Sequence, residues 1–117
     1  MGHRVVVGPQ SATGSGVRLM DDVVLARSVS VGGGSELGAR TIAGPQALIG
    51  EGAIIGSDTR LRRGAVVGDG AILGADCIVG RDSVVGPGAI LGDRVVVRRG
   101  ALVPAGSVVA ARTVVTP

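Results

Sequence analysis

Residues 67–90 read VGDGAILGADCIVGRDSVVGPGAI, and this stretch decides the fold. An aliphatic residue recurs every six positions, at Val67, Leu73, Val79 and Val85, and a small residue stands two places before each of the last three. Residues two apart on a strand point to the same side, so we expect the small and the aliphatic residue to face inward. The residue between them then faces outward, and the other three residues of each hexad form a corner.

The same period extends along the chain from Val7 to Val115. Of these 19 positions, 17 are Val, Ile or Leu, and the exceptions are Thr13 and Ala43. A strand plus a corner, repeated every six residues, leaves no room for a helix or a hairpin. We therefore expect the chain to coil in one direction, with each strand pairing in parallel with its counterpart one full coil away.

Glycine sets the number of hexads in a coil. Nearly all of the 22 Gly fall at the corners, where Gly supplies backbone angles that other residues reach only with strain. One column has an unbroken spacing of 18: Gly16, Gly34, Gly52, Gly70, Gly88 and Gly106. Three hexads therefore make a coil. The sequence predicts an all-β triangular prism of about six coils of 18 residues, roughly 30 Å long at about 4.8 Å per coil.

Length and composition narrow further the classes of protein to which this chain could belong. The 117 residues predict one domain, residues 1–117, with the repeat at 7–115 and a frayed first strand at 1–6. One Cys allows no internal disulfide and does not suggest an oxidising compartment. The longest apolar runs are too short for a membrane span, and the start MGHRVVVGPQ lacks the apolar stretch of a signal peptide. We expect a cytoplasmic protein.

The segments 67–72, 73–78 and 85–90 resemble the hexapeptide repeat of the left-handed β-helix superfamily. The left hand is implied by this resemblance and not by the spacing. Members of the superfamily include acyltransferases, γ-class carbonic anhydrases, C-terminal domains of sugar-nucleotide transferases and non-catalytic assembly subunits. The fold does not choose among these activities, so the choice depends on the residues of the site.

Residues that the enzymes of this superfamily need are missing. Its acyltransferases typically use a His as general base and its carbonic anhydrases hold zinc with three His, but His3 is the only His in this chain. Cys77 occupies a small inward position, where it is expected to fill the core. Gly68-Asp-Gly70 and Gly32-Gly-Gly34 are expected to be corners, because a phosphate loop needs a helix behind it. We therefore expect no catalytic residue, no metal and no cofactor.

The outward residues are aliphatic at twelve of thirteen positions from Ile42 to Val114, with Arg60 as the exception. A monomer rarely exposes large contiguous apolar patches, although Val and Ile also favour strands on their own account. The pattern indicates a homo-oligomer, either a trimer around a three-fold axis or an end-to-end stack. The candidate self-association face comprises Ile54, Ile72, Ile90 and Val108.

Charge singles out two corners. All 12 basic residues are Arg, and the formal net charge is +3. One corner gathers a candidate anion-binding edge, Arg27, Arg62, Arg63, Arg81, Arg98 and Arg99; the alternative is a solvated edge without a ligand. Nucleic acid is disfavoured as a partner because the chain has no aromatic residue for base stacking. Another corner alternates in sign and predicts a self-neutralising ladder: Arg4, Asp22, Arg40, Asp58, Asp76, Arg94 and Arg112.

Three functions are compatible with these features. The first is a non-catalytic β-helix that self-associates as an assembly or scaffold module. The second is an acyltransferase-like domain that binds acyl-CoA or a sugar nucleotide between subunits, with Arg62, Arg63 or Arg99 on phosphate. The third is a regulatory C-terminal domain detached from a sugar-nucleotide transferase. The missing internal His favours the first.

Overall fold

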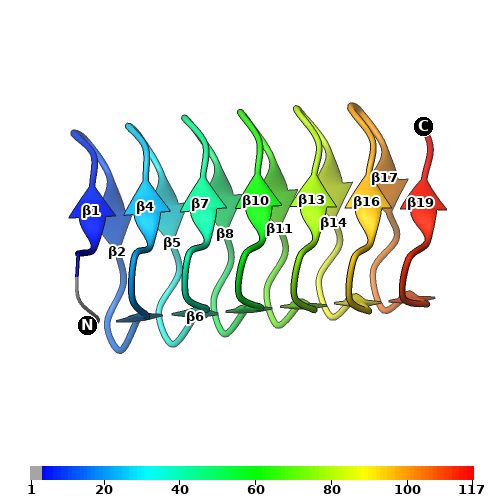
Figure 1. The fold of residues 1–117 in the computed structure, drawn as a ribbon, viewed down its shortest axis with the longest axis horizontal. Coiled ribbons are helices and arrows are strands. Elements are labelled where there is room, and N and C mark those ends of the chain that lie inside the picture. Colours follow the sequence, from blue (N-terminus) through cyan, green and yellow to red (C-terminus); the bar gives the residue numbers. More distant parts are fainter. Residues whose placement is uncertain (1–3) are drawn as a thin grey trace.

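The computed structural model describes residues 4–117, which form two-residue strands joined by corners (Figure 1). The strands are β1 (Val6–Val7), β2 (Ala12–Thr13), β3 (Arg18–Leu19), β4 (Val24–Leu25), β5 (Ser30–Val31), β6 (Glu36–Leu37), β7 (Ile42–Ala43), β8 (Leu48–Ile49), β9 (Ile54–Ile55), β10 (Arg60–Leu61), β11 (Val66–Val67), β12 (Ile72–Leu73), β13 (Ile78–Val79), β14 (Val84–Val85), β15 (Ile90–Leu91), β16 (Val96–Val97), β17 (Leu102–Val103), β18 (Val108–Val109) and β19 (Val114–Val115). The described residues contain no helix. The predicted all-β class is confirmed.

Three parallel sheets form the sides of a prism. Sheet A has the order β1-β4-β7-β10-β13-β16-β19, sheet B has β17-β14-β11-β8-β5-β2, and sheet C has β18-β15-β12-β9-β6-β3. Each strand pairs with the strand 18 residues further along, as Val67 does with Val85. The prism measures 32 × 20 × 20 Å, so the predicted three-hexad coil and the predicted length are both confirmed.

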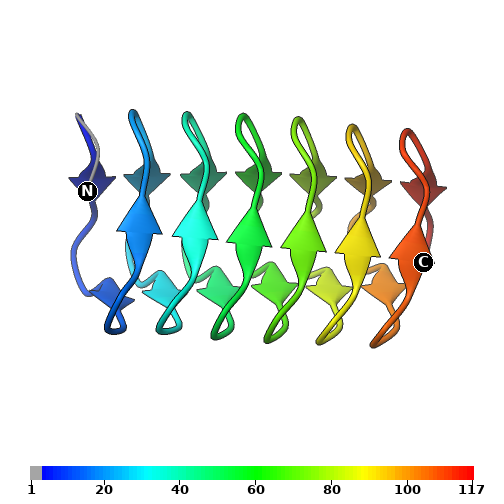
Figure 2. The ribbon, with the colours of Figure 1, turned by 90° about the horizontal axis from the view of Figure 1, so that it is seen from below.

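The two views of the ribbon give the hand of the coil. In Figure 1 the strands of sheet A run upward on the near side, and the chain returns behind them while it advances to the right. Figure 2 is seen from below, and the strands in its foreground are those of sheet C. They run from the side that is far from the viewer in Figure 1 to the side that is near. The winding is therefore left-handed, as the resemblance implied.

The core is a stack of aliphatic side chains without aromatic residues. Leu61, Val67, Leu73 and Val79 are all buried, whereas the neighbouring Ile72 is 40% exposed. The predicted inward and outward phase is therefore confirmed in these coils. Close packing of Val, Leu, Ile and Ala along a narrow prism supplies the buried apolar area that stabilises the fold.

Four polar side chains lie in this core, and each has a hydrogen-bond partner. Thr41, Thr59, Ser35 and Ser83 are fully buried. Their hydroxyls donate to main-chain carbonyls fifteen residues ahead, at 3.1, 3.0, 2.7 and 2.7 Å respectively. No buried side-chain N or O atom within residues 4–117 lacks a partner. Ser and Thr therefore fit the small inward position without an unpaired buried polar group.

Two different physical requirements explain why glycine occurs at the corners. The third residue of a corner takes a left-handed backbone. This residue is Gly in some corners, such as Gly88 (φ 69°), and a larger residue in others, such as Arg40 (φ 61°) and Asp58 (φ 60°). The first residue of a corner needs Gly for space: a Cβ on Gly86 would lie 2.6 Å from the main-chain N of Ala105 in the next coil. The expectation that backbone angle explains the corner glycines is therefore wrong for the first position, where close approach of two backbones decides.

Candidate anion-binding edge and surface hollows

Three edges connect the sheets, and we name them by the sheets they join. The AB edge includes residues 26–28, 62–64, 80–82 and 98–100; the BC edge includes 50–52, 68–70 and 86–88; the CA edge includes 38–40, 56–58, 74–76 and 92–94. The third BC position is the unbroken Gly column of the sequence. The charged residues concentrate on the other two edges.

All six arginines of the predicted anion-binding set lie on the AB edge, and all six are exposed. Arg63, Arg81 and Arg99 occupy the middle position of three successive corners on this edge, so about 5 Å separates their backbones along the prism. Arg62 and Arg98 occupy the first position of two of these corners. The sequence spacing thus brings the guanidinium groups together on one side of the molecule.

The positive charge of the AB edge is not compensated locally. Within residues 4–117, none of its six arginines has a carboxylate oxygen within 4.0 Å. The edge holds six Arg and one acidic residue, Asp82, which gives +5; the rest of the chain holds six Arg and eight acidic residues, which gives −2. The whole excess of positive charge therefore lies on one edge, where it attracts anions.

The CA edge carries opposite charges that pair with each other. Arg4 Nε lies 2.7 Å from Asp22 Oδ1, and Arg40 Nε lies 2.8 Å from Asp58 Oδ1. The hydrogen bond from Arg40 lowers the pKa of the Asp58 carboxyl group, and the same contact raises the pKa of Arg40. The predicted self-neutralising ladder is confirmed at these two pairs.

A hollow of about 550 Å³ adjoins the AB edge near its C-terminal end. Its floor includes the outward side chains of Ile78 and Val96, and its rim includes Arg98, Arg99 and Pro117. An apolar floor beside two unpaired guanidinium groups suits a ligand that has both an apolar part and phosphate groups. We call this the AB hollow.

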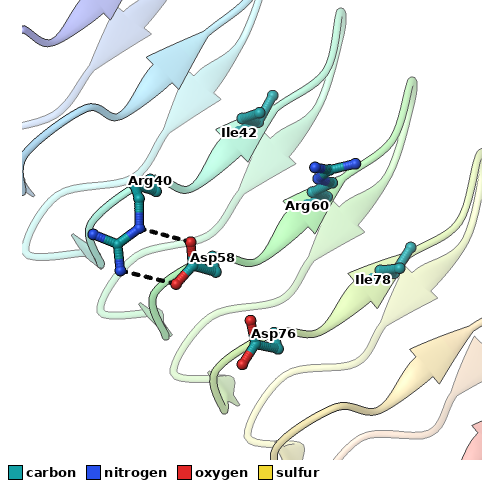
Figure 3. A pocket seen from close by; sticks show the side chains of 6 residues that line it. All are labelled: Arg40, Ile42, Asp58, Arg60, Asp76 and Ile78. Carbon is teal, nitrogen blue, oxygen red and sulfur yellow. Dashed lines mark hydrogen bonds and ion pairs between the residues drawn. The ribbon is translucent and has the colours of Figure 1, made fainter.

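A second hollow, of about 510 Å³, lies on the outer surface of sheet A and is called the sheet A hollow here. Its lining residues are Arg40, Ile42, Asp58, Arg60, Asp76 and Ile78 (Figure 3). The sequence analysis did not predict it. The available signal was Arg60, the one charged residue among the outward aliphatic side chains.

The predicted self-association residues share one face. Ile54, Ile72, Ile90 and Val108 are the outward residues of β9, β12, β15 and β18 in sheet C, and they are 43%, 40%, 43% and 77% exposed.

Cys77 is buried, and burial raises the pKa of its thiol. Residues 4–117 hold no group of three or more His, Cys, Asp or Glu side chains placed to bind a metal. They also include no helix suited to crossing a membrane. His3 lies outside the described residues.

Several solved structures share this architecture, including two that are named as acetyltransferases. A point mutant of perosamine N-acetyltransferase from Caulobacter crescentus, in complex with CoA and GDP-perosamine, is 27% identical over 93% of this chain and 50% of that one, with a TM-score of 0.73. The acetyltransferase domain of PglB from Neisseria gonorrhoeae is 19% identical over 91% of this chain and 54% of that one, with a TM-score of 0.82. A hexapeptide transferase family protein from Anaplasma phagocytophilum is 21% identical over 97% of this chain and 76% of that one, with a TM-score of 0.60.

This chain is a hexapeptide-repeat left-handed β-helix. It spans about half the length of the first two of these acetyltransferases. No protein-family model and no curated protein matches its sequence.

The expectation of a non-catalytic assembly module is wrong. The perosamine N-acetyltransferase structure that is 27% identical to this chain was solved with CoA and GDP-perosamine, which favours the acyltransferase-like alternative. The expectation depended on the missing internal His. A missing base does not show what the surface binds. The sequence already places the arginines on one edge, but the hollow beside them is visible only once the coils are stacked.

Proposed function

We propose that this β-helix binds acyl-CoA in an acyltransferase-like role, with the phosphate groups on the AB edge. The observation that carries the proposal is the net charge of +5 on this edge, beside a hollow with an apolar floor. The related perosamine N-acetyltransferase structure contains CoA, which supports this ligand class. The proposal rests on the edge and on that likeness together, because a basic edge alone accepts many anions.

The ligand groups match the two parts of the AB hollow. Guanidinium groups bind phosphate oxygens through paired N–H donors, and Arg98 and Arg99 stand at the rim without carboxylate partners. The less polar arm of CoA would lie over Ile78 and Val96. Arg62 and Arg63, two coils away at roughly 10 Å, extend the positive surface toward a further phosphate.

The proposal assigns donor binding to residues 4–117 and assigns none of them to proton transfer. These residues contain no His, the side chain that most often serves as a general base near neutral pH. The experiment therefore measures binding before turnover.

We also propose that the protein forms a homo-oligomer in which a second copy covers the sheet C face of Ile54, Ile72, Ile90 and Val108. Four aliphatic side chains that are each at least 40% exposed form a continuous strip along this face. Burying such a strip against another copy is favourable at about 25 cal/mol per Å² of apolar area. The AB edge stays free for the ligand, because it lies on the opposite side of the prism from sheet C.

Isothermal titration calorimetry with acetyl-CoA tests the proposal. Replacing both rim arginines (Arg98→Gln with Arg99→Gln) should weaken binding by about tenfold or more, since each removes a charge-assisted hydrogen-bond donor. The matched control replaces Arg94 and Arg112 by Gln. It makes the same charge change at the same end of the prism, but on the CA edge.

Three outcomes are informative. Tenfold loss in the first variant with little change in the control supports binding at the AB hollow. Equal losses in both variants would show non-specific attraction to the net charge, and no measurable binding to the unmodified chain would refute donor binding. A parallel titration with GDP shows whether the edge prefers CoA to a nucleoside diphosphate.

A further inference from the structure

The sheet A hollow contains two charged groups that make no hydrogen bond to the described residues. Arg60 and Asp76 make no side-chain hydrogen bond or ion pair within residues 4–117. The other two charged groups of the hollow, Arg40 and Asp58, neutralise each other through two hydrogen bonds of 2.8 and 3.0 Å. The hollow therefore offers one cation and one anion without a hydrogen-bonded partner in this part of the chain, although the Asp76 carboxylate also attracts Arg40 at longer range.

The positions of these groups follow from the coil. Arg60 is the outward residue of β10, opposite Ile42 of β7 and Ile78 of β13. Asp76 stands at the third position of the CA corner that precedes β13, with φ 61°. Two residues along the strand and one coil across it separate the backbones of Arg60 and Asp76 by about 8 Å.

Aliphatic side chains flank the charged groups. Figure 3 shows Arg60 on the middle strand with Ile42 and Ile78 on the strands to either side, while Arg40, Asp58 and Asp76 come from the preceding corners. Ile42 is 40% exposed and Ile78 is half-buried, so both offer apolar surface to a ligand. Arg60 is itself exposed, so an anion can reach its guanidinium group.

We infer that the sheet A hollow binds a small aliphatic zwitterion, with its carboxylate on Arg60, its ammonium group on Asp76 and its methylene chain against Ile78. Because Arg60 and Asp76 belong to different coils, with backbones about 8 Å apart, they suit an ω-amino acid better than an α-amino acid, whose two charges adjoin. The Arg40–Asp58 pair lies on the N-terminal side of the hollow, and its two hydrogen bonds occupy the Asp58 carboxylate. The inference does not rest on acyl-CoA binding, because its charged residues, Arg60 and Asp76, do not line the AB hollow; the two hollows share Ile78, so the two ligands would compete for that side chain.

The test is an NMR titration of the ¹⁵N-labelled 117-residue chain with 6-aminohexanoate, hexanoate and hexylamine. The zwitterion should move the amide signals of residues 58–62 and 76–78, with a dissociation constant of about 1–10 mM, because exposed ion pairs each contribute little. Hexanoate lacks the ammonium group and hexylamine lacks the carboxylate. Each should bind about fivefold more weakly.

Two variants and two controls locate the charges. Asp76→Asn and Arg60→Gln should each weaken 6-aminohexanoate binding by about fivefold, and Asp76→Asn should leave hexanoate binding unchanged. Asn tolerates the left-handed backbone at this position. The controls are Asp69→Asn on the BC edge and Arg18→Gln on sheet C, which remove similar charges elsewhere.

The ligand series on the unmodified chain decides the matter even if a variant folds poorly. The inference is overturned if the amide signals of these residues do not move, or if either single-charge compound binds as tightly as 6-aminohexanoate. It is also overturned if the control variants weaken binding as much as Asp76→Asn. Acetyl-CoA binding is measured on the same samples, so failure of one site is distinguishable from failure of the other.

Discussion

The Arg40 guanidinium binds the Asp58 carboxylate of the next coil through two hydrogen bonds, from Nε to Oδ1 at 2.8 Å and from Nη2 to Oδ2 at 3.0 Å. Both residues take a left-handed backbone at the third position of a CA corner. On the BC edge this position is always Gly. Side chains on the CA edge thus add an ion pair between coils at the cost of backbone strain.

This pair predicts a small acid-side change in stability. The hydrogen bond from Arg40 lowers the pKa of Asp58 below its ordinary value of 3.8 in the folded protein. The stabilisation is therefore complete above the ordinary value and is lost as the pH falls through the lowered one. Asp58→Asn should flatten the decrease in melting temperature between about pH 4 and pH 2. Asp69→Asn, which keeps an acceptor for the main-chain N of Glu51, is the control, and an unchanged pH profile for Asp58→Asn would contradict the expectation.

Gly86 and Gly88 belong to the same corner but should respond differently to alanine. A Cβ at Gly86 would clash with the main chain of Ala105, whereas a Cβ at Gly88 meets nothing within 4 Å. We expect Gly86→Ala to cost about 2–4 kcal/mol because two backbones must separate. Gly88→Ala should cost about 1 kcal/mol for its left-handed backbone. Urea unfolding of both variants measures the difference, and equal costs would refute the close-approach explanation.

The fold could be predicted from sequence because the period of six fixes the contacts. The inward position of Leu73 and the partner of Val67 both follow from counting hexads, since each coil repeats the same local geometry. The need for Gly at position 86 could not be predicted by counting hexads. Its neighbour in space is Ala105, and only the distance between the stacked backbones shows that a Cβ does not fit.

The candidate sites were predicted less well than the fold. Counting by 18 placed Arg63, Arg81 and Arg99 on one edge, and the structure brings them together there. The sheet A hollow depends on which charges find partners. Arg40 donates its hydrogen bonds to Asp58 and none to Asp76, although all three belong to one alternating column. The direction of each side chain decides which charges pair, and the period of the sequence does not determine that direction.

Cys77 should be replaceable by Thr with little loss of stability. Its Sγ lies 3.2 Å from the carbonyl of Gly92, the same relation that Thr59 makes with Gly74 one coil earlier and Thr41 with Gly56 two coils earlier. We expect Cys77→Thr to stay within about 1 kcal/mol of the unmodified protein. In that protein the raised pKa and the burial of the thiol should make labelling by a disulfide reagent slow until urea is added. Rapid labelling of the folded chain would contradict the buried position.

A charge in the core should be far more damaging than the same charge one residue earlier. Leu73 is 1% exposed and Ile72 is 40% exposed on the same strand. Leu73→Asp buries an unpaired carboxylate and should cost about 4 kcal/mol or more, whereas Ile72→Asp should cost about 1 kcal/mol. Thermal unfolding followed by circular dichroism compares the two. Similar melting temperatures would show that the inward and outward phase is assigned wrongly.

The sheet C face should control oligomerisation. A specific interface buries about 800 Å² on each partner. The prism is 32 Å long and 20 Å wide, so one flat face offers at most about 640 Å² of projected area, and side chains of the adjoining edges must contribute the rest. Ile72→Lys places a charge in the middle of the exposed strip, so it should shift the molecular mass toward that of the 11.4 kDa chain in light scattering at micromolar concentration. Leu48→Lys makes the same change on sheet B, where the side chain is 47% exposed, and should leave the mass unchanged. If the unmodified protein is a monomer throughout this range, its outward Ile and Val residues serve only to favour strands.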